Sequence, residues 1–272
     1  MTGSQMSELG RHGLSYAGIA QVYDLARPGY PDDLFAHLAD RLKGPQVLEV
    51  GAGTGKATVG LVARGFEVTC VEPVADMAAV LAERTAEAPP ARIEAATFEA
   101  ATAGGPFDGL VSAQAWHWTD PATRMDRAAS LLRPGGYLGL FWNSGAIRRQ
   151  DAFAALQTHY DEFGLFGDDR PQEPIGTAEN VAAVQDPSTW PGSELADHPA
   201  FEYLGTRLFQ WSQDFTAEQF AAFLLSTSHY QLMDPGTCDR LLTAVTATLR
   251  ARFDNLVTMD WSTQCYDALL LD

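Results

Sequence analysis

Between residues 46 and 142 the chain alternates short apolar segments with segments of helical periodicity, and this alternation restricts the possible folds more than any other feature. The apolar segments, which we expect to be β-strands, are residues 46–50, 66–72, 91–96, 107–113 and 135–142. The helical segments that separate most of them are about 10 to 14 residues long, which is typical of βαβ units. The strands of such units are parallel and covered by helices on both faces. The pattern therefore predicts an α/β domain built on a parallel sheet.

After Asn143 the alternation stops, and prolines interrupt a mixed segment that reaches residue 215. We expect a helix near 149–160 and a strand near 202–211 in this segment, and two strands within 255–271 that return to the sheet. The prediction is a doubly wound, mostly parallel seven-stranded sheet with an antiparallel C-terminal strand pair and a largely helical insertion. Its expected parts are an N-terminal arm or lid (1–31), a sheet domain (32–145 and 255–272) and an insertion that forms a substrate-binding lid (146–254).

Three helices begin with residues whose side chains can accept a hydrogen bond from the first helical turn. The predicted N-caps are Asp120, Thr216 and Asp234. Thr216 is followed three residues later by Gln219, which makes a capping box, and Phe215 and Phe220 are placed to pack as a hydrophobic staple.

The stretch VLEVGAGTGKATVGL (47–61) contains a glycine-rich loop directly after the first strand. A phosphate-binding loop of the G-x-x-x-x-G-K-[ST] type would need glycine at Val50 and a hydroxyl at Ala57, so the sequence argues against nucleotide hydrolysis. We then expect Lys56 to be an exposed residue of the first helical turn. A dinucleotide fingerprint would need a third glycine at Lys56, so a pyrophosphate ligand is also disfavoured.

The geometry behind the dinucleotide fingerprint still applies to the first two glycines. Gly51 and Gly53 allow a tight turn at the end of the strand and leave no Cβ in the path of a ligand. Glu72 ends the second strand, 21 residues after Gly51, where an acid can bind the hydroxyls of a ribose. These residues together predict an adenosine-type ligand.

The loop resembles motif I of the class I S-adenosylmethionine-dependent methyltransferases, with Glu49 inside the strand, and other segments are similar to a small-molecule branch of that family. The segments that carry the resemblance are YDLARPGYP (23–31), VEP (71–73), ATFEA (96–100), FDGLVSAQAWHW (107–118), LLRPGGYLGLFWN (131–143) and FLLSTSHYQL (223–232). The resemblance implies a Rossmann-like fold and S-adenosyl-L-methionine as cofactor.

The resemblance also implies which residues contact that cofactor. Glu72 would bind the ribose hydroxyls, the loop would pack against the amino-acid tail, and Phe98 would lie along the adenine. The full set of implied cofactor-binding residues is Tyr23, Arg27, Glu49, Gly51, Ala52, Gly53, Glu72, Pro73, Met77, Thr97, Phe98, Glu99 and Gln114. Within it, Glu49 would orient the ligand ammonium, and Arg27 would pair with the ligand carboxylate.

Structural alternatives remain open for several of these residues. Glu49 can be a buried acid that bonds backbone amides, and Phe98 can be an ordinary core residue. Glu99 can be a surface acid, and Gln114 can cap its strand. Arg27 can form a surface ion pair with Asp32 or Asp33.

Methyl transfer is an in-line displacement that needs alignment of donor and acceptor and no protein nucleophile. His117, which follows the fourth strand between Trp116 and Trp118, is the best-placed general base for an acidic acceptor, and the alternative is that it only stabilises its loop. His229 and Tyr16 are further candidates to reach the reaction site. Substrate contacts are predicted for Trp116, His117, Trp118 and Tyr230. The remaining histidines, His37 among them, show no ligand spacing and are expected at the surface, and no metal site is predicted.

Charge and cysteine content restrict the class of partner. The formal net charge is −17, from 35 acidic and 18 basic residues, which disfavours nucleic acid and anionic membranes as partners. Cys70, Cys238 and Cys265 are too widely spaced for a disulfide framework, and Cys70 falls in an apolar strand. The sequence shows neither a signal peptide nor an apolar stretch of about 20 residues, so a cytoplasmic protein is expected. Its oligomeric state stays open.

The predicted function is S-adenosylmethionine-dependent methylation of a small organic molecule at an O, N, S or C atom. One alternative is a relative that binds the same cofactor but catalyses a reaction other than methyl transfer or has a regulatory role. A nicotinamide-dependent oxidoreductase is a further alternative, weakened by Lys56 and by the lack of a recognisable Tyr-x-x-x-Lys motif.

Overall fold

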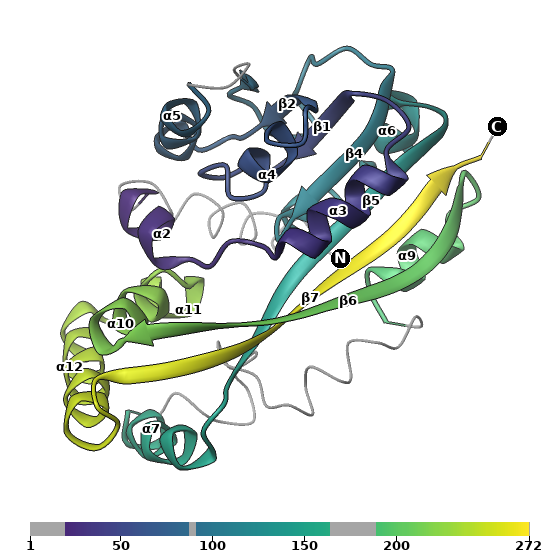
Figure 1. Cartoon of the computed structure of the whole chain (residues 1–272). Coiled ribbons are helices and arrows are strands. Elements are labelled where there is room, and N and C mark those ends of the chain that lie inside the picture. The colour runs from purple at the N-terminus through teal and green to yellow at the C-terminus, as the bar shows by residue number, and fades with distance from the viewer. Residues whose placement is uncertain (1–19, 87–90, 164–188, 272) are drawn as a thin grey trace.

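The computed structural model describes residues 20–86, 91–163 and 189–271, and it contains a seven-stranded sheet of strand order β3-β2-β1-β4-β5-β7-β6 (Figure 1). The strands are β1 (Gln46–Val50), β2 (Glu67–Val71), β3 (Arg92–Glu94), β4 (Phe107–Ala113), β5 (Leu132–Ile147), β6 (Phe201–Thr216) and β7 (Leu256–Leu270). Strands β1 to β5 are parallel, whereas β7 runs antiparallel to both β5 and β6. The predicted fold class, a mostly parallel Rossmann-like sheet with antiparallel C-terminal strands, is therefore confirmed.

Helices cover both faces of the sheet, as the alternation of strands and helices predicts. The helices are α2 (Ala20–Ala26), α3 (Asp32–Arg41), α4 (Thr58–Val62), α5 (Ala75–Arg84), the 3₁₀ helix η2 (Trp116–Trp118), α6 (Arg124–Leu131), α7 (Gln150–Glu162), α9 (Gly192–Asp197), α10 (Ala217–Leu225), α11 (Ser228–Gln231) and α12 (Pro235–Arg252). Helices α3 and α4 bury Leu34, Leu38 and Leu61 against one face. Helices α6 and α9 bury Met125 and Leu195 against the other.

The C-terminal strands differ from the prediction in one respect. Residues 256–270 form a single long strand, β7, instead of two, and its antiparallel partner β6 comes from within the 146–254 range. The reason is that this stretch contains neither Gly nor Pro with which to turn, and most of it is buried. The chain turns just before it, where Asp254 and Asn255 adopt positive φ angles of 52° and 59°.

The long strands continue beyond the parallel part of the sheet and carry a separate group of helices (Figure 1). A second core lies there, built from α7, α10, α12 and the adjoining ends of the strands. The buried side chains that form its centre are Leu156, Tyr160, Phe215, Phe220, Phe223, Leu241, Val245, Leu249, Met259 and Trp261. We call this group the helical unit. No helix of the described residues is long and apolar enough to cross a membrane.

Two of the three predicted helix caps are confirmed. Thr216 and Gln219 form the reciprocal capping box at the start of α10, and Asp234 accepts a hydrogen bond from the Thr237 amide at the start of α12. The cap at Asp120 is wrong, because α6 begins only at Arg124. The Asp120 carboxylate instead accepts from the Ala122 amide, so a turn precedes the helix.

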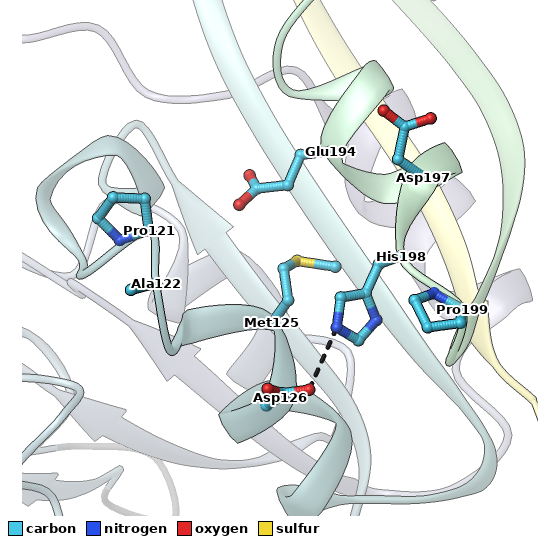
Figure 2. Close-up of a pocket in the computed structure, with 8 residues that line it drawn as sticks. All are labelled: Pro121, Ala122, Met125, Asp126, Glu194, Asp197, His198 and Pro199. Carbon is cyan, nitrogen blue, oxygen red and sulfur yellow. Dashed lines mark hydrogen bonds and ion pairs between the residues drawn. The ribbon is translucent and has the colours of Figure 1, made fainter. Parts of the chain in front are cut away.

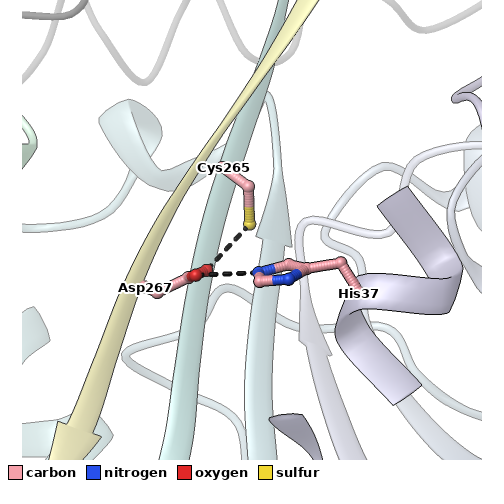
Figure 3. A group of neighbouring side chains, drawn as sticks. All are labelled: His37, Cys265 and Asp267. Carbon is pink, nitrogen blue, oxygen red and sulfur yellow. Dashed lines mark hydrogen bonds and ion pairs between the residues drawn. The ribbon is translucent and has the colours of Figure 1, made fainter. Parts of the chain in front are cut away.

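His37, expected at the surface, is buried in a hydrogen-bonded network between α3 and β7 (Figure 3). Its Nε2 lies 2.8 Å from Asp267 Oδ2, and Tyr137 donates to Asp267 Oδ1 at 2.6 Å. Burial raises the pKa of Asp267, but the hydrogen bonds from His37 and Tyr137 outweigh this effect and hold the pKa below its ordinary 3.8. His37 follows Leu34 by one helical turn, so it shares the apolar face of α3.

The same network has the composition of a metal site, because ligand atoms of His37, Cys265 and Asp267 all lie within 4.8 Å of one another. Two guanidinium groups already supply the positive charge there. Arg207 Nη1 lies 3.3 Å from His37 Nδ1, and Arg41 Nε lies 3.9 Å from Asp267. An arginine can only donate, so Nδ1 accepts and Nε2 carries the proton that His37 gives to Asp267. We therefore interpret the cluster as a structural network that joins α3 to β7.

Replacing Asp267 with asparagine should lower the free energy of unfolding by about 2–3 kcal/mol, because a buried donor of His37 or Tyr137 then loses its acceptor. The matched control is Asp260→Asn on the same strand, whose ion pair with Arg148 is exposed and should contribute much less to stability. Urea unfolding of both variants measures the difference. Equal effects of the two substitutions would contradict the structural role of the network.

Candidate functional site

The glycine turn after β1 forms the floor of the candidate site. Gly51 and Gly53 have φ angles of +69° and +56°, which residues with a Cβ rarely adopt. A Cβ on Gly51 would lie 2.3 Å from the Cβ of Ala115, so the β1 and β4 loops approach too closely for a side chain there. A Cβ on Gly53 would meet nothing within 4 Å. The turn is therefore closely packed on one side and open above Gly53.

Glu72 joins the end of β2 to this turn. Its carboxylate accepts from the Gly53 amide at 2.8 Å through one oxygen and from the Val74 amide at 2.8 Å through the other. Burial raises the pKa of Glu72, and the hydrogen bonds from Val74 and Gly53 oppose that rise. The acid thus lies beside the open side of the glycine turn, where the sequence predicts a ribose.

Glu49 points into the same region and is fully buried. Its Oε2 accepts from the Thr58 hydroxyl at 2.7 Å, whereas its Oε1 is enclosed without a hydrogen-bond partner. Burial, with a smaller contribution from Glu72, raises the pKa of Glu49 to about 8. The alternative that Glu49 bonds backbone amides is not what the structure contains. An enclosed oxygen without a donor is a site that an ammonium group fits.

The arm helix α2 lies between the glycine loop and the helical unit (Figure 1). Arg27 donates to the Ser226 carbonyl at 3.0 Å, and its guanidinium lies 5.2 Å from the centre of the Tyr23 ring and 5.8 Å from that of Phe223. Arg27 Nε is buried without a hydrogen-bond partner. The alternative ion pair of Arg27 with Asp32 or Asp33 is wrong: the described residues contain neither pair, and Asp32 pairs with Arg64 instead.

Lys56 is not the exposed helical residue that the loop sequence predicts. Its ammonium group donates to the Asp24 carbonyl of α2 and lies 3.7 Å from the Asp24 carboxylate, which also pairs with Arg84. Lys56 therefore joins the arm to the glycine loop, because its partner Asp24, which it contacts through both the carbonyl and the carboxylate, lies on α2.

Tyr30 belongs to the site, although the sequence did not single it out. Its ring packs edge-on against Phe141 with centroids 5.0 Å apart, and its hydroxyl hydrogen-bonds the Gln114 side chain. Burial raises the pKa of Tyr30 strongly, with Tyr23 and Glu49 adding to the effect. Gln114 has a φ of +56°, and its backbone amide donates to the Phe141 carbonyl at 2.8 Å. It therefore ends β4 with its backbone and reaches Tyr30 with its side chain. The signal that could have found Tyr30 is its position in the YDLARPGYP segment.

The two residues predicted beside the adenine, Phe98 and Glu99, differ in their burial. Phe98 is only 3% exposed and packs between Trp116, 5.8 Å away, and the Arg127 guanidinium, 5.2 Å away. Glu99 is exposed and accepts from the Asp120 amide at 2.8 Å. Both positions agree with the structural alternatives: Phe98 is part of the core, and Glu99 holds a loop.

The other predicted cofactor residues surround the glycine turn at different depths. Ala52 is buried under the turn, and Met77 is buried on α5 against Ala20 of the arm. Pro73 and Thr97 are exposed. The structure therefore gathers the glycine turn, Glu49, Glu72, Tyr23, Arg27 and Gln114 at the carboxyl ends of the parallel strands, which is the edge where open α/β sheets bind ligands.

The segment after β4 forms η2, and its three residues differ in their surroundings. Trp116 is fully buried and donates to Glu194 at 3.3 Å, so its ring belongs to the core beneath α9 instead of lining a substrate pocket. His117 and Trp118 are half-buried, with ring centroids 4.4 Å apart. Burial, and secondarily Arg124, lowers the pKa of His117 to about 4. His117 is therefore neutral at physiological pH and able to accept a proton, although only weakly.

Glu194 on α9 holds η2 in place. Its carboxylate accepts from Arg124 at 2.7 and 2.8 Å in bidentate geometry, and from the Trp190 indole at 2.9 Å. The Arg124 guanidinium lies between the rings of Trp116 and Trp190, at 5.6 and 5.5 Å. This contact could not be predicted from the sequence around Trp116, because α9 lies almost 80 residues further along the chain.

The remaining predicted residues are less closely connected to the site. His229 is half-buried on α11, with its ring 5.9 Å from that of Tyr230. Tyr230 is only 2% exposed and lies in the core of the helical unit, so it has little surface to offer a substrate. Tyr16 lies outside the described residues.

A surface cavity of about 310 Å³ lies elsewhere, between α6 and α9 (Figure 2). Its lining is Pro121, Ala122, Met125, Asp126, Glu194, Asp197, His198 and Pro199. His198 Nε2 lies 3.3 Å from Asp126 across it. None of the residues predicted to bind cofactor or substrate lines this cavity, so we do not assign the candidate site to it.

Comparison with known proteins identifies the domain. Residues 48–140 match the model of a methyltransferase domain. An uncharacterized methyltransferase of Mycobacterium tuberculosis is 39% identical over 131 residues, which cover 48% of this chain and 53% of the relative. An uncharacterized methyltransferase-like protein of Schizosaccharomyces pombe is 26% identical over 219 residues, 76% of this chain and 74% of the relative. This chain thus spans about half the length of the mycobacterial relatives that it matches.

The fold is shared with a solved structure described as a type II methyltransferase of Anaeromyxobacter dehalogenans. The two structures superpose with a TM-score of 0.63 at 20% identity, over 90% of this chain and 98% of the other.

Glu49 should make stability depend on pH in a predictable direction. The folded protein holds the Glu49 proton up to a pKa of about 8, whereas the unfolded carboxyl loses it above its ordinary 4.5. The unfolded state therefore binds fewer protons in this interval, and stability falls as pH rises from about 4.5 to about 8. Glu49→Gln has no carboxyl to titrate, so its stability should not show this fall. Its free energy of unfolding should therefore rise relative to that of wild type as pH increases across the interval, on the order of 4 kcal/mol in total.

Urea unfolding at pH 5, 6.5 and 8 measures the difference between the two proteins. Glu67→Gln, which changes an exposed acid on the adjacent strand β2, is the matched control and should follow wild type. A constant difference between Glu49→Gln and wild type at all three pH values would show that Glu49 is ionised in the folded protein.

Proposed function

Because residues 48–140 carry the methyltransferase domain of the class I S-adenosylmethionine-dependent family, we propose that this protein methylates a small organic molecule with S-adenosyl-L-methionine as donor. The observation that carries the proposal is the enclosed, unpartnered Oε1 of Glu49 beside the open glycine turn and the Glu72 carboxylate. These groups match a ligand that combines an ammonium, a ribose and no phosphate.

The residues fit the cofactor group by group. The open side of Gly53 leaves room for the ligand at the end of β1. Each Glu72 oxygen uses one lone pair for a backbone amide, so a second lone pair remains for a ribose hydroxyl. Glu49 would accept from the ligand ammonium, and the unpartnered Nε of Arg27 would donate to the ligand carboxylate.

When bound, the cofactor supplies a methyl group on a sulfonium centre that an acceptor atom attacks in line. The contribution of the chain is to hold the two partners in alignment and to exclude water. We propose that the arm and the α10–α11 segment, which Arg27 joins through Ser226, cover the edge of the sheet and so form the substrate-binding lid.

The properties of His117 restrict the acceptor. A histidine with a pKa of about 4 is a weak base, so it can assist only an acceptor whose proton is already acidic. A phenol or a carbon acid activated by carbonyl groups meets this condition better than an alcohol does, and a carboxylic acid is already ionised at neutral pH and needs no base. We propose His117 as the proton acceptor and Trp118 as a contact for such a substrate. A cytoplasmic location stays a prediction.

Gly53→Ala should weaken the binding of S-adenosylhomocysteine at least tenfold, because the new methyl group occupies the space above the turn. The matched control is Gly65→Ala. Gly65 also has a positive φ, +84°, and nothing within 4 Å of its Cβ, but it precedes β2 at the opposite edge of the sheet. Both variants should lose about 1 kcal/mol of stability from the strained φ, and only Gly53→Ala should lose affinity.

Isothermal titration calorimetry of the wild type and both variants with S-adenosylhomocysteine is the measurement. Wild-type protein that binds neither S-adenosylhomocysteine nor S-adenosylmethionine would refute the proposed function. Binding of a nicotinamide dinucleotide instead would favour the oxidoreductase alternative. Once binding is established, an increase of one CH₂ in the mass of an acceptor distinguishes methyl transfer from other uses of the cofactor.

A further inference from the structure

A chain of three hydrogen bonds crosses the antiparallel half of the sheet and ends on the arm. The Trp211 indole of β6 donates to Thr263 Oγ1 of β7 at 3.0 Å, and the Thr263 hydroxyl donates to Asn143 Oδ1 of β5 at 2.6 Å. The Asn143 amide then donates to the Gly29 carbonyl at 2.9 Å. The register supports the chain, since Asn143 and Thr263 are directly paired across β5 and β7.

The direction of every bond in this relay is determined by its two ends. An indole N–H can only donate, and a backbone carbonyl can only accept. The Thr263 hydroxyl must therefore accept from Trp211 and donate to Asn143, and the Asn143 amide must turn its nitrogen toward Gly29. Thr263 is fully buried, so water cannot replace its partners. The relay has a single arrangement, which makes it a precise support for whatever it contacts.

Its end point lies at the centre of the segment that brings the arm to the candidate site. Gly29 stands between Arg27, which reaches Ser226, and Tyr30, which reaches Gln114. Pro28 and Pro31 flank this segment and have no amide hydrogen with which to anchor it. The bond from Asn143 to the Gly29 carbonyl therefore fixes the backbone from which Arg27 and Tyr30 project.

The start of the relay lies in the helical unit. Trp211 stacks on Trp261 with centroids 5.7 Å apart, and Trp261 meets Phe223 edge-on at 5.6 Å. Phe223 is also the ring against which the Arg27 guanidinium packs. The helical unit thus contacts Arg27 from two sides: directly through Phe223 and Ser226, and through the relay that supports Gly29.

We propose that Asn143 is a positioning residue that sets the arm for cofactor binding, by holding the Gly29 carbonyl so that Arg27 and Tyr30 reach the ligand. This inference rests on the proposed function for the identity of the ligand. If Asn143 were only a brace of the sheet, its replacement would lower stability without a specific link to Arg27.

The test is a double-mutant cycle between Asn143→Asp and Arg27→Met, with S-adenosylhomocysteine affinity as the readout. An aspartate at this position can still accept from Thr263, but it cannot donate to Gly29. One of its carboxylate oxygens would then face the Gly29 carbonyl oxygen. Asn143→Asp should weaken binding about tenfold in the wild-type background, as expected for one lost hydrogen bond and an unsatisfied carbonyl. In the Arg27→Met background it should weaken binding less than threefold, because Arg27, one of the two residues through which it acts, is gone. Equal effects in both backgrounds would overturn the proposal.

A second pair of variants keeps the test decisive if Asn143→Asp does not fold. Thr263→Val removes the middle link of the relay with little change in volume, and Thr263→Ser restores the hydroxyl. Thr263→Val should weaken binding severalfold and Thr263→Ser should return the affinity to within twofold of wild type. If the Thr263→Val and Thr263→Ser proteins bind S-adenosylhomocysteine equally well, the relay does not position the arm.

Hydrogen exchange in the ligand-free protein separates this inference from the proposed function. Thr263→Val and Asn143→Asp should both accelerate amide exchange at Gly29 and Tyr30, whereas Thr263→Ser should not. A wild-type protein that fails to bind S-adenosylhomocysteine refutes the proposed function and with it the ligand assigned to the arm. Unchanged exchange at Gly29 and Tyr30 in both variants refutes the positioning role itself, whatever the ligand.

Discussion

Two backbone amides on one buried carboxylate hold the functional edge of this sheet together. Gly53 and Val74 follow neighbouring strands, and both donate to Glu72, which closes β2. Their amides would otherwise be orphaned beside a helix start, at a cost of about 1–3 kcal/mol each. The same contact explains the positive φ of Gly53, because the turn must reverse for its amide to reach the acid. The open space above Gly53 is therefore a consequence of how β1 and β2 are joined.

The charges around this turn select between ligand classes. Glu49 and Glu72 are both buried there, and a further negative charge would lie beside Glu72 and raise the pKa of Glu49 further. A pyrophosphate would bring two such charges, and Lys56 cannot offset them because its ammonium group is bound to Asp24. A ligand with an ammonium and a sulfonium would instead favour ionised Glu49. The electrostatics thus argue for a cationic nucleoside more directly than the missing third glycine does.

Residues whose roles follow from local geometry could be predicted from the sequence, and those whose roles depend on distant packing could not. Gly51, Gly53 and Glu72 lie where strand length and turn chemistry place them. Trp116, by contrast, is buried by a helix from another part of the chain. His37 is buried because Asp267 lies opposite it, 230 residues further along the chain. Polar and aromatic residues on an apolar face stay ambiguous until the partner that covers them is known.

The arm helix α2 is where the two halves of the molecule meet. Lys56 holds it from the glycine loop, and Ser226 and Asn143 hold its C-terminal end from the helical unit and the long strands. These contacts come from elements on both sides of the described part of α2, so together they fix its position. The position of α2 therefore depends both on the glycine loop and on the helical unit with its long strands. A ligand that shifted the glycine loop would have to move α2 or break its contacts, and either outcome would alter the contact between α2 and α10.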